Sequence, residues 1–328
     1  MDIKKRVLAA RKLLETNGLG CFLLSSREDI FYYSGYKASE GNFLIIDKKQ
    51  KPSLFVSPLE NDAEKIKGVD LVYLTSGDRL IKELKGKLVG FDESNLKSWT
   101  FLNLHRRHIR LKKSTKLIKL PREVKTEEEI ENIKAAIKIS RKILDRLKFY
   151  NKTEIEVANT IEAGFKINNS EAAFDTIVSN GSSSIHHLPE NRSIKKTEPT
   201  IIDFGAKYNW YCCDITRSFP GSQKKWKLVW ENVKNIQEQI IDNVKPGIKM
   251  EDLQNLYKKL MGKNRYKIYH SFGHGLGLEV HEQITGELKE GMIITVEPGV
   301  YLKHFGGIRI EDDVLVRKGK AFVLTEKI

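Results

Sequence analysis

Cysteine is scarce in this 328-residue chain, and its three cysteines do not make a disulfide framework. Cys212 and Cys213 are adjacent in sequence, a spacing that rarely bridges, and Cys21 would then be left over. This usage indicates a reducing compartment, so we expect a cytoplasmic protein. We predict that Cys212 and Cys213 pack inside a strand; thiol ligation or nucleophilic catalysis is the alternative.

Long hydrophobic runs are also missing from the sequence. No segment approaches the roughly 18 consecutive apolar residues that a membrane-spanning helix needs. The first ten residues, MDIKKRVLAA, carry charge but no apolar stretch, so we do not expect a signal peptide. The sequence therefore predicts no membrane partner.

Acidic residues are outnumbered, because 57 Lys and Arg stand against 43 Asp and Glu and give a formal net charge of +14. A nucleic-acid groove would need clustered basic residues with interleaved aromatics. The lysines are instead spread over the whole chain without such a block. We interpret the charge as a solvated basic surface and expect no nucleic-acid partner.

The first third of the chain alternates short apolar runs with polar, helix-like segments. Residues 3–17 predict an amphipathic helix that ends at Gly18. Strands are predicted at 21–24, 43–46, 54–56, 71–74 and 88–91, and helical segments at 58–66 and 79–84. Strands alternating with helices predict an α/β domain. This domain shows no phosphate-type glycine loop and no cluster of metal-ligand residues.

A basic stretch over residues 112–125, which contains Pro121, predicts the domain boundary. Two domains are also the usual expectation for a chain of 328 residues. We place them at 1–118 and 119–328.

The second domain repeats one order of elements: two helices, a segment with histidine, and a hairpin with two carboxylates. The helices are predicted at 126–149 and 153–168 in the first half, and at about 224–244 and 250–262 in the second. Thr126 and Thr153 open their helices with a capping box, since a glutamate follows three residues later. The overall expectation is an α/β (α+β) protein whose second domain has a pseudo-twofold internal repeat.

The first hairpin is predicted over residues 200–217, TIIDFGAKYNWYCCDITR, where β-branched and aromatic runs flank a turn. If Tyr208 and Asn209 form the turn centre, Asp203 and Asp214 become direct cross-strand partners.

The second hairpin is predicted over residues 294–312. A turn over 303–305, centred on His304, places Glu297 opposite Glu311. Like charges directly opposite across a ladder are destabilising, so a fold that does this twice needs cations between its carboxylates. Four carboxylates are too many for one tetrahedral zinc, and a pair of divalent ions is therefore predicted.

Residues 270–281 add histidines to the predicted metal ligands, and three glycines lie close to these histidines. Glycine lets the backbone approach another group closely, so we interpret His274 and His281 as site residues and His270 as an ordinary core or surface histidine. An oxygen-rich site with one imidazole suits Mn, Co, Fe or Zn.

A second histidine segment, the polar loop of residues 178–189, contains the adjacent His186 and His187. One of the two can face the site, because adjacent side chains diverge.

These segments resemble the pita-bread metallopeptidases, a family that includes methionine aminopeptidase, aminopeptidase P and prolidase, with creatinase as a metal-free relative. The matching motifs are IDFG at 202–205, CDITR at 213–217, FGHGLG at 272–277, VEPG at 296–299 and GIRIED at 307–312. Residues 1–118 look like the creatinase-type N-terminal domain. That domain favours the Xaa-Pro dipeptidase and Xaa-Pro aminopeptidase branch.

The resemblance implies two divalent ions per subunit, with Mn or Co favoured and Fe or Zn compatible. Asp203 would bind one ion, His274 and Glu297 the other, and Asp214 with Glu311 both.

The resemblance also implies the catalytic roles. His186 matches the histidine near the leaving side of the substrate, and His281 the one that hydrogen-bonds the scissile carbonyl. Glu297 would relay a proton to the leaving nitrogen, and Arg309 would orient neighbouring acidic groups.

The implied activity is hydrolysis of the Xaa-Pro bond of dipeptides or short peptides by a homodimer. One departure concerns substrate length, because the segment after His281 lacks the arginine by which prolidases hold the dipeptide carboxylate. The alternatives are an aminopeptidase of other specificity, a metal-free creatinase-like amidinohydrolase and a non-catalytic binding protein. The complete ligand set argues against the last two.

Overall fold

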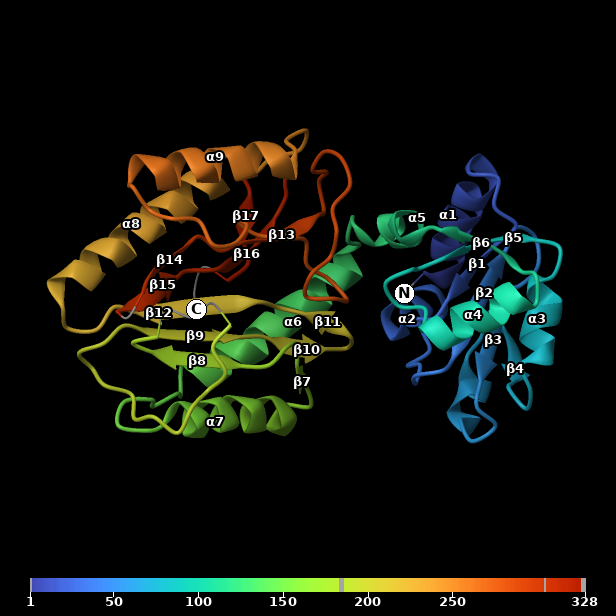
Figure 1. Ribbon diagram of the computed structural model, residues 1–328, viewed down its shortest axis with the longest axis horizontal. Helices are drawn as coiled ribbons and strands as arrows, with labels where there is room; N and C mark the ends of the chain where they lie inside the picture. The colour runs from blue at the N-terminus through green and yellow to red at the C-terminus, as the bar shows by residue number, and fades with distance from the viewer. Residues whose placement is uncertain (1, 183–185, 304, 326–328) are drawn as a thin grey trace. The chain divides into compact units, whose positions relative to one another are not determined.

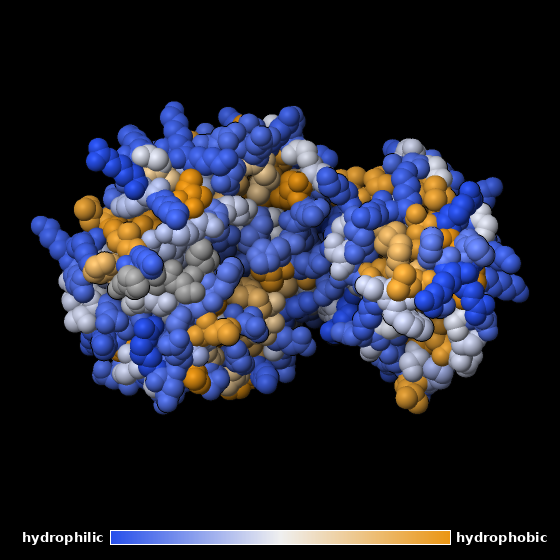
Figure 2. Space-filling view, viewed as in Figure 1, coloured by the Kyte–Doolittle hydropathy of each residue, from blue (hydrophilic) through white to orange (hydrophobic). Residues whose placement is uncertain are grey.

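A computed structural model describes residues 2–182, 186–303 and 305–325. The chain forms two compact units, Met1–Arg122 and Glu123–Ile328, which Figure 1 shows in blue to cyan and in green to red. No helix in the described ranges is long and apolar enough to cross a membrane. On the face of the C-terminal unit seen in Figure 2, hydrophilic residues dominate and apolar residues form small groups.

The N-terminal unit is built on one mixed sheet with the strand order β4-β3-β2-β1-β5-β6. Its elements are α1 (Ile3–Thr16), β1 (Cys21–Leu24), α2 (Arg27–Ser34), β2 (Phe43–Asp47), β3 (Ser53–Val56), η1 (Asn61–Lys65), β4 (Asp70–Tyr73), α3 (Asp78–Leu84), β5 (Leu88–Phe91), α4 (Ser98–Arg106) and β6 (Arg110–Lys113). Apolar residues from its strands and helices share one buried core. The α/β prediction for this part of the chain is therefore confirmed.

Local signals gave most of these elements. All five predicted strands are present, and the first helix ends just before Gly18, whose φ of 65° suits glycine. The helical segment predicted at 58–66 is only a short 3-10 helix, η1. Strand β6 was missed because Arg110–Lys113 is charged, as is common for a strand at a sheet edge.

The basic stretch predicted as a boundary is ordered structure. It continues from β6 into α5 (Thr115–Lys119) and the 3-10 helix η2 (Leu120–Arg122). Two buried aromatic residues hold it in the N-terminal unit, because Tyr33 donates a hydrogen bond to Ile118 O (2.8 Å) and Tyr32 to Pro121 O (2.6 Å).

The C-terminal unit places its strands between two pairs of helices, α6 with α7 and α8 with α9 (Figure 1). The first half comprises α6 (Glu127–Leu144), α7 (Glu154–Ile167), β7 (Glu171–Ala172), β8 (Ile177–Asn180), β9 (Thr200–Phe204), β10 (Ala206–Tyr208), β11 (Tyr211–Cys212) and β12 (Ile215–Phe219). The second comprises α8 (Lys224–Ile241), α9 (Met250–Lys263), β13 (Ile293–Val296), β14 (Gly299–Leu302), β15 (Gly306–Arg309), β16 (Asp312–Leu315) and β17 (Phe322–Val323). The predicted repeat of element order is confirmed.

Both capping boxes are present, so α6 and α7 begin where the sequence predicted. Two helices end earlier than expected. Helix α6 stops at Leu144, five residues short, and the Phe149 ring instead packs 4.6 Å from Phe219. Helix α8 stops at Ile241, three residues short, and the next residues form tighter turns in which Asn243 N donates to Ile240 O (3.0 Å) and Val244 N to Ile241 O (3.0 Å).

The two halves meet through their hairpins, since β9 and β12 both contact β15. Ser218 Oγ donates to Arg309 O (2.7 Å) and accepts from Arg309 N (2.9 Å), while Glu311 N donates to Thr216 O (3.2 Å). These contacts bring the carboxylates of both halves to one place.

Candidate metal centre

The first hairpin has a different register from the predicted one. Its turn is formed by Asn209 and Trp210, both with positive φ (46° and 73°), as a type I′ hairpin turn requires. This moves the pairing by two residues, so Asp203 lies opposite Thr216 rather than Asp214. The predicted direct pairing of Asp203 with Asp214 is therefore wrong.

Asp214 instead lies in an interruption of this hairpin, between the pairs β10–β11 and β9–β12. The register places it opposite Gly205, where a Cβ would lie only 1.8 Å from Cys213 O. Glycine is thus required at this position. Asp203 and Asp214 become diagonal neighbours, which still places them on one face of the sheet.

The second hairpin has the predicted register. The strand pairs β13–β16 and β14–β15 have the same register, which runs from Val296↔Asp312 to Gly299↔Arg309. This register places Glu297 opposite Glu311, but both residues lie in the interruption between the two strand pairs. The turn centre predicted at His304 lies outside the described residues.

Four side chains from both halves converge on one point. His274 Nε2 lies 3.6 Å from Asp214 Oδ2 and 3.4 Å from Glu297 Oε1. Ligand-type atoms of Asp214, His274 and Glu311 all lie within 4.8 Å of one another. The measured separations exceed ordinary hydrogen bonds, whereas two atoms bound to one ion at about 2.1 Å lie about 3 to 3.5 Å apart.

His274 is held by a segment that runs beside β13. His274 N donates to Thr295 Oγ1 (3.0 Å), and Thr295 N donates to His274 O (2.8 Å). A Cβ on Gly273 would lie 2.0 Å from Thr295 O, so only glycine permits this approach. His274 Nδ1 lies 3.1 Å from Gly275 O, and an N–H donated there leaves Nε2 as the ligand atom.

Three carboxylates of the centre, those of Asp214, Glu297 and Glu311, have raised pKa values. Burial, followed by the charge of Asp203, raises the pKa of Asp214 well above its usual range. Burial and then Asp214 do the same to the pKa of Glu311, and burial raises the pKa of Glu297 to about 8. Burial lowers the pKa of His274 to about 4 and keeps the imidazole neutral. Bound cations would relieve this repulsion.

Within the described part of the chain, only one of the two carboxylate oxygens of Asp203 has a hydrogen-bond partner. Its Oδ2 accepts a hydrogen bond from Arg309 Nη2, while its buried Oδ1 has no hydrogen-bond partner among the residues that the structure describes. A buried oxygen of this kind, beside four other ligand-type groups, fits a hard or borderline divalent ion. The donor set therefore fits the metals that the sequence predicts.

Arg309 links the two hairpins. Besides Asp203, it donates from Nη1 to Tyr301 Oη (2.8 Å) and from Nε to Thr216 Oγ1 (3.1 Å). Thr216 in turn donates to Glu311 Oε2 (2.7 Å). One buried guanidinium thus contacts a carboxylate of the first half directly and one of the second half through Thr216.

The other predicted histidines occupy different positions around this centre. The His281 ring is exposed and lies 4.2 Å from the His274 ring, centroid to centroid. His186 is exposed in the loop after β8. Burial, and then the charge of Arg309, lower the pKa of His270 to about 4.

Sequence reasoning set His270 aside, but the structure places it beside the centre. Its Nδ1 lies 3.7 Å from Glu297 Oε2, and its Nε2 lies 3.0 Å from Tyr301 Oη. Tyr301 was not predicted at all. A tyrosine four residues after a ligand carries no metal-binding signal by itself, so only the fold reveals it.

The loop that carries His281 has its own support, which was also missed. Lys125 Nζ lies 3.0 Å from Glu282 Oε2, both side chains being buried, and Glu282 Oε1 accepts from Leu278 N (3.0 Å). Glu123 Oε1 accepts from Thr285 N (2.8 Å). Glu282 therefore holds the backbone next to His281 in place.

The cysteines support packing rather than chemistry. Cys212 and Cys213 are buried and unbridged, and Cys213 Sγ lies 3.1 Å from Ser140 Oγ. Burial, and then the charge of Asp313, raise the pKa of Cys213 well above its usual range. A thiol held in its protonated form is a poor ligand and a poor nucleophile.

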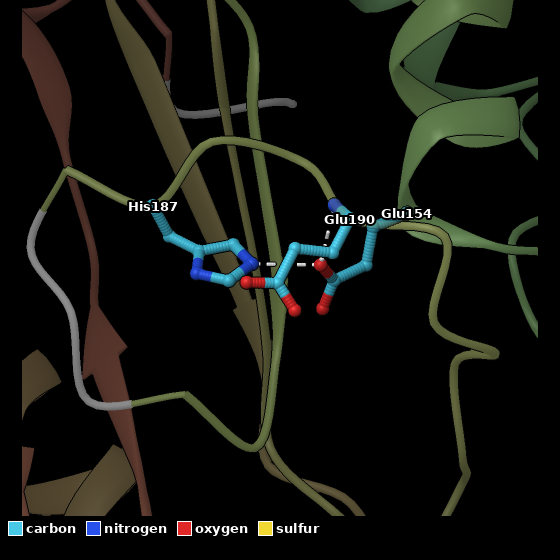
Figure 3. Close-up of side chains that lie close together, drawn as sticks. All are labelled: Glu154, His187 and Glu190. Atoms are coloured by element: carbon cyan, nitrogen blue, oxygen red, sulfur yellow. Dashed lines mark hydrogen bonds and ion pairs between the residues drawn. The ribbon is translucent and has the colours of Figure 1, made fainter.

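A second group of ligand-type side chains, Glu154, His187 and Glu190, lies in the first half (Figure 3). Its geometry alone would admit an ion. The Glu154 carboxylate, however, already accepts four hydrogen bonds, one of them from the Arg192 guanidinium at 2.7 Å. The nearby guanidinium would repel a metal ion, and the four hydrogen bonds occupy the lone pairs of the Glu154 oxygens. Both facts argue against a metal at this position.

Comparisons with known proteins identify the family of this chain. Residues 131–318 match metallopeptidase family M24, and residues 6–124 match the creatinase/prolidase N-terminal domain. The chain is 32% identical to the Xaa-Pro dipeptidase of Pyrococcus furiosus over 99% of its own length and 98% of that protein.

Solved structures show the same fold. The prolidase from Pyrococcus horikoshii OT3 has a TM-score of 0.92 at 30% identity, covering 99% of both chains. The X-Pro aminopeptidase from Thermotoga maritima has a TM-score of 0.86 at 30% identity, covering 97% of this chain and 96% of that one. With a creatinase-type N-terminal domain, a pita-bread domain and this cluster of acidic groups, the chain belongs to metallopeptidase family M24.

Proposed function

We propose that this enzyme hydrolyses the Xaa-Pro bond at the amino end of dipeptides or short peptides and uses two divalent ions per subunit. The convergence of His274 with carboxylates from both hairpins carries this proposal. The full-length similarity to a protein named Xaa-Pro dipeptidase supports the substrate class. Asp203, Asp214, His274, Glu297 and Glu311 are the proposed ligands. Mn or Co are the proposed ions, and Fe or Zn also suit these ligands.

The bound ions would supply Lewis-acid chemistry, which acidifies water and polarises a peptide carbonyl. The residues of the chain have separate tasks. His281, exposed next to His274, donates a hydrogen bond to the carbonyl oxygen as negative charge develops on it. Glu297 passes a proton to the leaving imino nitrogen, and His186 lies on the leaving side. Arg309 fixes the orientation of Asp203.

The test is metal removal and reconstitution. Protein treated with EDTA should not hydrolyse Ala-Pro, and Mn or Co should restore the activity. Metal analysis of the restored enzyme should give two ions per chain. Full activity in metal-free protein would refute the proposal, and full activity with a single ion per chain would refute its dinuclear form.

Substrate length is a separate part of the proposal. Residues 282–292, which follow His281, contain no arginine, and a peptide carboxylate without a charged partner is costly to bury. We favour a dipeptidase in which another cation serves. Equal kcat/KM for Ala-Pro-Ala and Ala-Pro would instead show a site open at its carboxyl end.

The proposal extends to organisation and location. We place the catalytic domain at 119–328 and the N-terminal domain at 1–118. Three buried, unbridged cysteines support a reducing compartment such as the cytoplasm. The homodimer is supported by the family resemblance, and light scattering on the purified protein tests it.

A further inference from the structure

Glu154, the first residue of α7, is a buried carboxylate that the metal centre does not use. Burial would raise the pKa of Glu154, but hydrogen bonds from Arg192, the Asn180 N–H, His187 and the Glu190 N–H hold it below its usual range. The group is therefore a charged acceptor inside the protein, and all its hydrogen bonds come from one loop.

Three of the four donors lie in the middle of that loop, and the fourth belongs to Asn180, where the loop leaves β8. Glu154 Oε1 accepts from Asn180 N (2.8 Å), at the end of β8, and from Arg192 Nη2 (2.7 Å). Its Oε2 accepts from His187 Nε2 (2.7 Å) and Glu190 N (3.0 Å). Figure 3 shows His187 and Glu190 reaching Glu154 from the same stretch of chain. One carboxylate thus binds both the start of the loop and its middle.

The loop is also attached through its backbone. Glu154 N donates to Arg192 O (3.1 Å), and Ile194 N donates to Lys152 O (2.8 Å). The side chain of Asn180 accepts from Lys195 N (2.9 Å) and donates to Thr200 Oγ1 (2.9 Å). These contacts would preserve the general course of the loop if the Glu154 charge were lost.

Beyond these backbone contacts, the Glu154 carboxylate fixes the orientation of the His187 ring. This ring is buried against Glu154, whereas the adjacent His186 is exposed. The two neighbouring side chains thus leave the backbone toward the interior and toward solvent. Fixing His187 on the inner side therefore fixes the side from which His186 projects.

We propose that Glu154 is a positioning residue for peptide hydrolysis, because it holds His187 and thereby directs His186 toward the substrate. This inference rests on the proposed function, in which His186 lies on the leaving side. Glu154 itself touches neither the substrate nor the proposed ions.

Glu154→Gln keeps the shape of the side chain and removes its charge and one acceptor. It should lower kcat about 10- to 100-fold, as a misplaced catalytic group does, with bound metal and KM little changed. Glu156→Gln is the matched control, because Glu156 caps the same helix through Thr153 N (2.7 Å) and is exposed. It should lower stability slightly and leave kcat unchanged.

A double-mutant cycle separates positioning from a general structural role. Once His186→Ala has removed the group that Glu154 directs, Glu154→Gln should cause no further loss of kcat. Equal losses in both backgrounds would overturn the proposal. If His186→Ala alone leaves kcat unchanged, the proposed role of His186 fails first, and this result is distinguishable from the failure of Glu154.

A second pair of variants applies if Glu154→Gln does not fold. His187→Gln can still donate a hydrogen bond to Glu154, whereas His187→Leu cannot. The first should retain more kcat than the second, with equal metal content. Wild-type kcat in His187→Leu would contradict the proposal.

Discussion

The two hairpins of the C-terminal unit contribute the same kind of residue by different means. In the first, Asp203 lies within a strand and is paired with Arg309, while Asp214 lies in the interruption. In the second, both Glu297 and Glu311 lie in the interruption. Like charges are thus not opposed across a regular ladder, where they would be destabilising.

Because of this difference, the negative charges of the two hairpins are not equally balanced by positive partners within the protein. The first hairpin contains one carboxylate, Asp203, that already has a guanidinium partner, and one, Asp214, whose pKa is raised by burial. The second contains two whose pKa values are raised by burial. The second hairpin should therefore depend more on bound cations, and the following changes test this comparison.

Removal of a ligand shared by both ions should have the largest effect. Asp214→Asn, from the first hairpin, and Glu311→Gln, from the second, should both reduce peptidase activity to that of EDTA-treated wild type and lower the bound metal. Glu287→Gln is the control, since this side chain is exposed and outside the centre. Retained activity in either ligand variant would remove that residue from the ligand set.

Glu282 is unsuitable as a control, although the sequence gives it no place among the ligands. Its buried carboxylate pairs with Lys125 and accepts from Leu278 N. Glu282→Gln should therefore disturb the loop that carries His281.

Substitution of the two histidines that we propose to be catalytic should lower kcat and leave the bound metal in place. His281→Ala and His186→Ala remove groups on the second-half and first-half sides of the centre. Loss of a donor to a developing oxyanion typically costs about 100- to 1,000-fold in kcat, which we expect for His281. Metal analysis is the deciding measurement, because an empty site in either variant would reassign that histidine as a ligand.

Arg309→Met should break the link between the hairpins. Asp203 would lose its guanidinium partner, and breaking one side of a buried ion pair costs about 3 to 5 kcal/mol of stability. Metal affinity should fall by about 10- to 100-fold, as for other groups that orient ligands. Arg317→Met, at a more exposed arginine that pairs with Glu127, should change neither quantity. An unfolding free energy equal to wild type would contradict the bridging role.

The smallest effect concerns metal-free protein. Glu297 has a folded pKa of about 8, above its unfolded value near about 4.3. Between these values the folded state holds a proton that the unfolded state has lost, so the free energy of unfolding falls as pH rises. His274 acts in the opposite direction, but only below about pH 6.5, because its folded pKa is lowered.

The window from about pH 6.5 to 8 therefore isolates the carboxylates. EDTA-treated protein should lose about 2 kcal/mol of stability across it from Glu297 alone, as measured by chemical unfolding. Glu297→Gln should flatten this dependence. An identical slope in the variant would show that the second hairpin is not strained by its buried charge.

Local signals predicted most of the fold and all five proposed ligands. Capping boxes at Thr126 and Thr153 located two helices, and turn and strand patterns located both hairpins. The register of the second hairpin was predicted correctly, because a turn with an odd number of residues has a single central residue about which the strands pair. The first was wrong because its turn uses Trp210 in a left-handed conformation, which a bulky aromatic rarely adopts and no dipeptide signal announced.

The supporting residues could not be predicted from local patterns. Lys125 and Glu282 are 157 positions apart in sequence, and Glu154 reaches donors up to 38 positions away. Each looks like an ordinary surface charge until the fold buries it. Tyr301 likewise has meaning only through Arg309 and His270.

The pairing of Lys125 with Glu282 sets a limit on how the protein can be dissected. An excised fragment that starts at the capping box of Thr126 would contain every proposed ligand, but it would lack Lys125 and Glu123, which hold residues 278–285. Such a fragment should load metal and yet turn over peptide poorly. A functional minimal enzyme must begin before Glu123, so the shortest catalytic module is longer than its ligand set suggests.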